Sequence, residues 1–404
     1  MAKLIEITGK ALSGEWGSDD TYGNGIPVLR TTNFTNDGVV NYHNVVTRII
    51  TKKNITEKYL RSGDIIIEKS GGSDKQPVGR VIYFNGPERT YLFNNFTGLL
   101  RVQDPSKWFP RYVFFALYAN YWRGGTRRFE NKTTGLHNLK IDDYVSRFDI
   151  PEVPLDQQIY ICDILDKIRS LIDTRKQQLR ELDNLIKARF VEMFGHPVSN
   201  EMNWSQVPLA ACIDSIDNGK SFVCDTTARQ GNWPAVLKLS AATYGFYRPE
   251  ENKAMLDDRL FLEDAAVRAG DLLFTRKNTP ELVGMCAYVY NTPQKLMMPD
   301  LIFRLNTTTD CNKIFLWKLI NHDFFRERIQ SIATGSAKSM SNISKERLSG
   351  LTIILPPIKL QEQFAAFVEQ VDKSKVAEAT HALCTLFNII LNGGTRYDIR
   401  TNEF

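Results

Sequence analysis

The sequence has none of the features that mark a secreted or membrane-embedded protein. No run of about eighteen apolar residues occurs, so we expect no membrane span. The N-terminal stretch MAKLIEITGKALSGEWG carries charges where a signal peptide needs an apolar core. Its six cysteines include no C-x-x-C pair, which favours reduced packing residues over a disulfide framework or a metal cage. An intracellular protein is therefore expected.

A recognisable catalytic constellation is also absent from the sequence. The five histidines are isolated and lack the spacing of metal ligands. Asp64, Glu68 and Lys69 resemble the acidic cluster of a nuclease, but the matching segment of a second copy, Thr275-Arg276, has no acid. We therefore expect no catalytic residue, no bound metal and no cofactor in this chain.

A long helix is the strongest pattern that the sequence contains, and it is expected from Leu155 to Phe194. Apolar residues alternate at four and three apart, which is the seam of a coiled coil. Its seam positions are Ile161, Leu165, Ile168, Ile172, Leu179, Leu182, Ile186 and Met193, with Arg175 and Arg189 as charged members. Forty residues make a rod of about 60 Å, which needs a partner helix to cover the seam.

A second amphipathic helix near the C-terminus is the expected partner. It begins at Leu360, continues through Phe364, Val368 and Val371, and stops at Asn392 before two glycines. Beyond Lys375 its seam slips to Val376, Leu383, Phe387 and Ile390. The two helices are predicted to pair in opposite directions, because a repeated chain implies a pseudo-two-fold axis.

The sequence contains an internal repeat with a period of about two hundred residues. Several short motifs recur in the same order, and the number of residues that separates each matched pair stays nearly constant. The matched pairs are Arg61-Ser-Gly-Asp64 with Arg268-Ala-Gly-Asp271, Val78-Gly79 with Val283-Gly284, Arg101 with Arg304, Asn138 with Asn342, and Gln158 with Gln363. Each copy therefore predicts a globular domain that leads into a long helix.

The predicted fold class is α+β: two similar globular domains of mixed strands and helices, separated by the antiparallel pair of long coiled-coil helices. Short β-branched runs at 26–29, 64–67 and 80–84 are expected strands, whereas 107–123 and its counterpart 312–332 are expected buried helices. The predicted boundaries are 1–150 for the first domain, 151–195 for the central helix, 196–353 for the second domain, 354–392 for the C-terminal helix and 393–404 for a disordered tail.

Basic and amide-bearing residues recur at matched loop positions of the two copies. The formal net charge is only +5, which permits nucleic-acid binding without requiring it. Arginine and lysine neutralise phosphates and read guanine edges, while asparagine reads adenine. The candidate DNA-binding residues are Arg30, Thr32, Asn33, Lys69, Ser70, Arg127, Arg128, Lys132 and Thr133 in the first copy, and Lys238, Ser240, Arg276, Lys277, Asn278, Lys338, Ser339 and Asn342 in the second. The competing interpretation is ordinary solvated loop charge.

Three segments together resemble a known family. The motif GIPVLRTTNF, the loop RSGDIIIEKSGG and the helix that ends in LIKARFVEMFG are similar to those of type I restriction-modification specificity subunits, and the similarity extends from about Leu12 to Lys375. After Lys375 the chain departs from the family pattern, since it lacks the MFG ending of the first helix.

The resemblance implies a non-catalytic, DNA-binding subunit with two target recognition domains, each reading one half of a split sequence in double-stranded DNA. The paired helices would set the spacer and dock two methyltransferase subunits, which use S-adenosylmethionine. Restriction subunits would add ATP- and magnesium-dependent translocation and cleavage, in a complex that defends a prokaryotic cytoplasm against foreign DNA and meets the nucleoid through DNA.

Two alternatives remain open from the residues themselves. One is a coiled-coil scaffold that does not read DNA sequence, and the other is a self-contained nuclease or methyltransferase. Against the latter stands the absence of an Asn-Pro-Pro-Tyr type motif and of a glycine motif for S-adenosylmethionine. The sequence does not indicate which bases are read.

Overall fold

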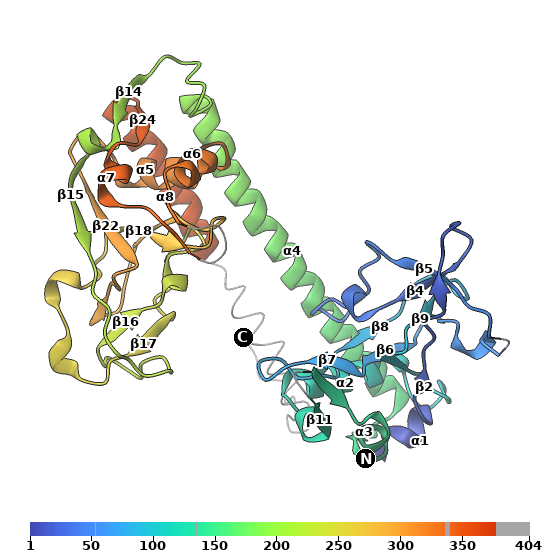
Figure 1. Ribbon diagram of the computed structural model, residues 1–404. Coiled ribbons are helices and arrows are strands. Elements are labelled where there is room, and N and C mark those ends of the chain that lie inside the picture. Colours follow the sequence, from blue (N-terminus) through green and yellow to red (C-terminus); the bar gives the residue numbers. More distant parts are fainter. Residues whose placement is uncertain (53, 134–135, 336–339, 377–404) are drawn as a thin grey trace. The chain divides into compact units, whose positions relative to one another are not determined.

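The computed structural model describes residues 1–376 except 53, 134–135 and 336–339 (Figure 1). The chain divides into two compact units, one comprising Met1–Lys176 and the other beginning at Gln177. No helix in the described part of the chain is long and apolar enough to cross a membrane. The disordered tail predicted at 393–404 lies outside the described residues.

The first unit is built on two four-stranded sheets and one three-stranded sheet. Their orders are β2-β10-β6-β8, β3-β5-β4-β9 and β11-β12-β7, and β1 pairs with β13. The strands are β1 (Ala2–Lys3), β2 (Leu12–Ser13), β3 (Ser18–Asp19), β4 (Ile26–Leu29), β5 (Val46–Ile49), β6 (Ile65–Glu68), β7 (Ser70–Gly72), β8 (Val81–Tyr83), β9 (Leu92–Phe93), β10 (Thr97–Leu100), β11 (Glu130–Thr133), β12 (Leu136–Leu139) and β13 (Asp149–Ile150). The helices are α1 (Leu4–Thr8), α2 (Pro110–Trp122), α3 (Ile141–Arg147) and the start of α4 (Leu155–Phe194), with 3₁₀ turns η1 (Thr31–Asn33), η2 (Thr56–Lys58) and η3 (Arg127–Phe129).

The second unit repeats most of this plan. Its sheets are β15-β22-β18-β20, β17-β16-β21, β14-β24 and β19-β23. The strands are β14 (Ser205–Pro208), β15 (Ile213–Asn218), β16 (Ala235–Leu237), β17 (Asn252–Ala254), β18 (Leu272–Thr275), β19 (Lys277–Asn278), β20 (Cys286–Tyr288), β21 (Leu296–Met297), β22 (Ile302–Thr307), β23 (Ser341–Asn342) and β24 (Thr352–Leu355). The helices are α5 (Lys313–Asn321), α6 (Arg326–Ser331), α7 (Lys345–Ser349) and α8 (Ile358–Val376), with 3₁₀ turns η4 (Leu209–Cys212), η5 (Leu239–Ala241), η6 (Asp258–Leu260), η7 (Glu263–Ala265) and η8 (Asp323–Phe325).

The internal repeat is confirmed by strand topology. The sheet β2-β10-β6-β8 of the first unit has its counterpart in β15-β22-β18-β20 of the second, with antiparallel pairing throughout. Both units also contain one parallel pair, β4 with β9 and β16 with β21. The prediction of two similar domains with mixed strands and helices is therefore correct.

The repeated Val-Gly pair has a steric cause in both units. Gly79 and Gly284 adopt φ values of +103° and +75°, a region that other residues rarely occupy. A Cβ atom at Gly79 would lie 2.8 Å from Thr126 Cγ2, and one at Gly284 would lie 2.3 Å from Ile329 Cγ2. Each glycine lets the chain pass close to a neighbouring element, which explains why the sequence motif recurs.

The aromatic helix predicted at 107–123 is α2, and its aromatic residues pack in the core, except Trp122, which is 52% exposed. Phe114, Tyr118 and Tyr121 are all buried within the first unit's main apolar cluster or beside it. The single helix predicted at 312–332 is wrong. The segment contains α5, which Asn312 caps at its N-terminus, then η8 and α6, because His322 ends α5 in an extended conformation and accepts a hydrogen bond from Phe324 N–H.

Helix α4 has the length that its heptad pattern predicts, but its seam has two different packing environments. In the first unit, Leu165, Ile168 and Ile172 join the cluster formed with α2 and α3, and Ile161 packs against its edge. In the second unit, Ile186 is buried in a cluster that also contains α8 residues Phe364, Val368 and Val371, and Leu182 packs against that cluster. The predicted partners beyond Lys375, and the side chain of Val376, lie outside the described residues.

The contact between α8 and the end of α4 involves residues that the heptad pattern misplaces. Phe190 and Phe194 are fully buried, and both rings lie edge-on to Phe364 at 5.5 and 5.4 Å between centroids. Toward the other end of α8, Lys375 forms a 2.7 Å ion pair with Asp183. The two helices therefore run in opposite directions within this unit, and Phe190 and Phe194, rather than Arg189 and Met193, are the fully buried residues.

Each long helix is fixed to its own domain by a buried glutamine near its start. Gln158 Oε1 accepts a hydrogen bond from Phe109 N–H at 2.8 Å, and its amide donates to the carbonyls of Lys107 and Val153. In the second unit Gln361 Oε1 accepts from Asn312 N–H at 2.9 Å, and its amide donates to the carbonyls of Asp310 and Pro356. The counterpart of Gln158 is therefore Gln361, so the sequence match to the exposed Gln363 is two residues out of register.

Replacing Gln361 by leucine is expected to lower the free energy of unfolding by about 3 kcal/mol, because three buried backbone groups lose their partner. The matched control is Gln363→Leu on the exposed face of the same helix turn, where a change within about 0.5 kcal/mol is expected. Denaturant titration followed by circular dichroism measures both. Equal effects from the two variants would contradict the anchoring role.

Candidate nucleic-acid interface

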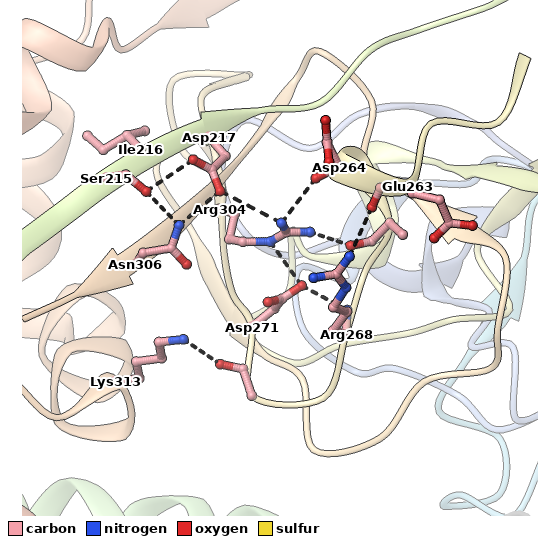
Figure 2. A network of polar contacts seen from close by, with 12 residues as sticks. Ser215, Ile216, Asp217, Glu263, Asp264, Arg268, Asp271, Arg304, Asn306 and Lys313 are labelled. Carbon is pink, nitrogen blue, oxygen red and sulfur yellow. Dashed lines mark hydrogen bonds and ion pairs between the residues drawn. The ribbon is translucent and has the colours of Figure 1, made fainter.

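A buried ion pair explains the repeated Arg-x-Gly-Asp motif in both units. Asp64 bonds Arg101 at 2.7 Å and accepts Arg61 N–H at 2.8 Å. Asp271 Oδ2 forms an ion pair with Arg304, at 3.1 Å from Nε, and accepts Arg268 N–H at 2.8 Å, as Figure 2 shows. Asp64 is thus a structural residue that closes the turn before β6, which argues against its assignment to a nuclease cluster.

Arg304 is the centre of the second unit's network. Its guanidinium donates to the backbone carbonyl of Asp264 at 3.2 Å and to that of Ala266, and lies 3.7 Å from the Asp217 carboxylate (Figure 2). Because β22 carries Arg304 and β15 carries Asp217, the arginine joins the sheet to the turn formed by η7. This network stabilises the frame from which the candidate loops project.

In the first unit, one small sheet brings three predicted loop groups together. β12 pairs with β7, which begins at Ser70, and with β11, which contains Lys132 and Thr133. η3 carries Arg127 and Arg128 directly before β11, and Arg127 donates to the carbonyls of Asp74 and Lys75 at 3.2 and 3.4 Å. Both arginines are exposed.

Polar contacts connect the hairpin of β11 and β12 to the loop that follows β7. Glu130 accepts Val78 N–H at 3.0 Å with one carboxylate oxygen, and the other lies 2.8 Å from His137 Nδ1. Across the ring, His137 Nε2 lies 3.4 Å from the exposed carboxylate of Asp74. Because these contacts join the hairpin to the loop after β7, they hold together the two segments on either side of which the basic residues of this region lie.

Glu68 is the last residue of β6 and Lys69 directly follows it, and burial shifts the pKa values of the two side chains in opposite directions. Burial raises the pKa of Glu68, an effect that the neighbouring Arg80 guanidinium opposes. Burial also lowers the pKa of Lys69, whose ammonium donates to Ser13 Oγ at 3.1 Å. Arg80 bonds Glu68 at 3.4 Å and the carbonyl of Thr31 at 2.9 Å, and so ties η1 to the same region.

In the second unit, the corresponding residues form a similar assembly. β19, which contains Lys277 and Asn278, pairs with β23, which contains Asn342. Arg276 Nη2 donates to Asn342 Oδ1 at 3.2 Å, and its guanidinium lies 5.0 Å from the Phe303 ring centroid. Lys277, which directly follows Arg276 in the chain, is partly exposed.

The turn after β16 belongs to the same region of the second unit. Asn278 Nδ2 donates to Thr243 Oγ1 at 3.1 Å, which connects β19 to the loop that follows η5. Ser240 Oγ donates to Glu251 at 2.8 Å, and Lys238 Nζ lies 3.7 Å from the same carboxylate. The Ser240 hydrogen bond is the main cause that lowers the pKa of Glu251, with Lys238 and Arg248 adding to it.

Several amides proposed to read bases make hydrogen bonds inside the protein. Asn33 is buried, accepts Arg30 N–H at 3.0 Å and donates to the carbonyls of Asn41 and His43. Asn278 is buried and accepts Thr279 N–H, while Asn342 accepts from Arg276. Asn33 and Asn278 therefore serve local structure in this chain, and a role of their amides in reading bases stays a prediction.

Other candidates differ in exposure. Thr32, Arg127 and Arg128 are exposed, whereas Arg30 is partly buried and donates to the carbonyl of Asn44 at 3.3 Å. Lys338 and Ser339 lie outside the described residues, as do the side chains of Lys132 and Thr133. For the exposed basic residues, DNA contact stays a prediction.

Sequence reasoning missed two contributors to this region. Arg80, which directly follows the Val-Gly pair, was not assigned a role. A basic residue next to a recurring glycine is only a weak sign that its side chain makes a structural contact. The loop Tyr244-Gly-Phe-Tyr-Arg248 was also missed, although three aromatic residues around one glycine are a recognisable signal of a fixed turn.

Comparison with known proteins places these geometries in context. A family model described as type I restriction modification DNA specificity domain matches residues 2–184 and 218–381. The chain is 22% identical over 367 residues to the type I restriction enzyme EcoKI specificity subunit of Escherichia coli (strain K12), covering 85% of this chain and 75% of that protein. It is 28% identical over 176 residues to the EcoEI specificity subunit of Escherichia coli, covering 43% of this chain and 30% of that protein.

Solved structures share the fold. The S subunit of a type I restriction-modification system from M. genitalium superposes with a TM-score of 0.54 at 12% identity, covering 96% of this chain and 94% of that one. A chain from a study of complex assembly and conformational transition of the type I R-M system gives a TM-score of 0.51 at 17% identity, covering 98% and 97%.

Proposed function

Because the chain belongs to the family of type I restriction modification DNA specificity domains, we propose that it is the DNA-recognition subunit of a type I restriction-modification complex. Each unit reads one half of a bipartite target in double-stranded DNA. The observation that carries this proposal is an assembly that recurs in both units: a short strand at a lysine, paired with a second strand. It is formed by β7, which directly follows Lys69, with β12 in one unit, and by β19, which begins at Lys277, with β23 in the other.

The chain binds and positions DNA, and partner subunits perform the chemistry. Two methyltransferase subunits supply S-adenosylmethionine-dependent methylation, and restriction subunits supply ATP- and magnesium-dependent translocation and cleavage, in a prokaryotic cytoplasm. Supporting this division, the acids nearest to a nuclease pattern, Asp64 and Glu68, are paired with Arg101 and Arg80. Among the described residues no cluster of three or more potential metal ligands occurs.

The long helices act as the spacer between the two readers and as the docking surface for the methyltransferase subunits. In support of this role, α4 is a single helix of 40 residues whose two ends belong to different apolar clusters. A spacer of about 60 Å covers between one and a half and two turns of duplex DNA.

The test is a reconstituted complex of this chain with its methyltransferase subunits and a duplex that carries the motif found by methylome sequencing of the host. We expect selective binding that weakens steeply as salt rises. Binding without sequence preference would favour the scaffold alternative, and methyl transfer or nicking by the isolated chain would favour the enzyme alternative.

Replacing Lys277 by alanine is expected to weaken binding to all duplexes and to reduce the slope of log Kd against log salt by about 0.9, because one phosphate contact is lost. The control is Lys3→Ala, an exposed lysine on β1, a strand that carries none of the candidate DNA-binding residues. A slope that does not change in the Lys277 variant would remove this lysine from the interface.

A further inference from the structure

The loop between η5 and β17 of the second unit presents two aromatic rings to solvent. Tyr244 and Phe246 are 53% and 52% exposed, and they lie two residues apart on one turn. Between them Gly245 adopts a φ of +86°, so the backbone turns sharply and both rings leave the same bend.

Hydrogen bonds to three other segments of the second unit hold the bend in place. Trp317 Nε1 on α5 donates to the carbonyl of Gly245 at 2.9 Å. Thr243 Oγ1 donates to Leu239 O at 2.8 Å, and Arg248 N–H donates to Ala241 O at 2.9 Å. On the far side, the Tyr247 hydroxyl lies 2.7 Å from Thr292 Oγ1. A turn fixed in this way loses little conformational entropy when its exposed rings bind a partner.

Positive charge accompanies the rings. The Arg248 guanidinium lies 4.7 Å from the Tyr244 ring centroid and 5.4 Å from that of Phe246, and it donates to Ser240 O at 3.3 Å. Glu251 interacts electrostatically with Arg248, but its carboxylate accepts a hydrogen bond from Ser240 and lies 3.7 Å from Lys238 Nζ. Because Thr243 also bonds Asn278 of β19, the bend adjoins the strand that carries Lys277.

We propose that Tyr244 and Phe246 form an aromatic wedge that stacks on bases of the target duplex at one locally unstacked step, with Arg248 holding the rings in place. This inference rests on the proposed function and adds a means of recognition that does not depend on base-edge hydrogen bonds. Aromatic rings stack on any base, and wedges inserted between base steps kink duplex DNA, so the wedge favours sequences that unstack easily.

The wedge belongs to one half-site. The corresponding loop of the first unit, after η1, has Asn36 and Asp37 at its tip instead of aromatic residues. Its backbone is held from the domain side, by Tyr118, whose hydroxyl donates to Asn36 O at 3.0 Å, and by Arg169, which donates to Asp37 O. The two units therefore read their half-sites by different means, although they share a fold.

The experiment measures binding of the reconstituted complex to the methylome-defined duplex for the wild type and the Tyr244→Ala/Phe246→Ala variant. The wild-type complex must first bind this duplex selectively. If it shows no sequence selectivity, the result contradicts the proposed function rather than the wedge. The double variant is expected to bind about 10-fold or more weakly, from the loss of base stacking, with an unchanged salt slope, because rings release no counterions. Phe246→Trp should retain binding, and Phe324→Ala, an aromatic of 49% exposure outside this region, should behave as wild type.

A scan with abasic sites identifies the step. A missing base removes the unstacking cost, so wild-type affinity should rise at one position of one half-site, and the double variant should lose that maximum. Wild-type-like affinity of a folded double variant would overturn the wedge. A fall in affinity with a reduced salt slope and no abasic maximum would also overturn it, since the loop would then contact phosphates. Lost assembly with the methyltransferase at unchanged DNA affinity would assign the rings to protein docking and overturn it too.

Discussion

Asp271→Asn is expected to lower the free energy of unfolding of the second unit by about 3 kcal/mol, because it leaves the Arg304 guanidinium buried without its carboxylate. Both side chains are largely buried, and Arg304 Nε lies 3.1 Å from Asp271 Oδ2. The remaining contacts of Arg304, to two backbone carbonyls and to the partly exposed Asp217, do not replace a buried counter-charge. Urea unfolding of the full chain, followed by the fluorescence of tryptophans such as Trp317, measures the loss.

The matched control is Asp257→Asn, which removes the carboxylate of the exposed ion pair with Arg259. Exposed pairs are screened by water and salt, so this variant should unfold like the wild type. The equivalent change in the first unit, Asp64→Asn, should destabilise that unit through Arg101. If Asp271→Asn proves as mild as Asp257→Asn, the network in Figure 2 does not hold the frame of the interface.

The parts of the fold that sequence predicted best are those governed by a single periodic rule. The bounds of α4 follow from its apolar spacing, and β4 follows from a short β-branched run. The repeat was visible because its landmarks are structural: Gly79 and Gly284 permit close approach, and Asp64 and Asp271 close the same turn. Such constraints act on the residue type itself, so they survive divergence of the surrounding sequence.

Residues whose role depends on distant partners were predicted poorly. The local hydrogen bonds of Asn33 and Asn278 were missed because a polar loop residue gives no sign of whether its amide is already satisfied. The glutamine register failed for a similar reason, since Gln361 and Gln363 differ only in which face of α8 they occupy. Likewise, the buried pair Phe190 and Phe194 displaced Arg189 from the seam because α8 and α5 approach that face together.

Deleting residues 174–180 of α4 is expected to shorten the unspecified spacer of the recognised DNA sequence by about three base pairs. Seven residues span about 10.5 Å of helix, and each base pair occupies about 3.4 Å. The deleted stretch lies between Ile172, the last α4 residue in the first unit's cluster, and Leu182, the first that packs against the second unit's cluster. Both packing surfaces are therefore retained.

The deletion of one heptad also preserves the relative rotation of the two readers, because seven residues return a helix to within about 20° of its starting direction. A three-residue deletion in the same stretch turns the second reader by about 60° and should abolish selective methylation rather than shift it. Substituting alanine at the exposed residues Thr174, Lys176, Gln177 and Arg180 without changing the length is the control, and it should leave the motif unchanged. Methylome sequencing of cells carrying each variant reports the spacer directly. An unaltered spacer in the heptad deletion would mean that something other than the length of α4 sets the distance between half-sites.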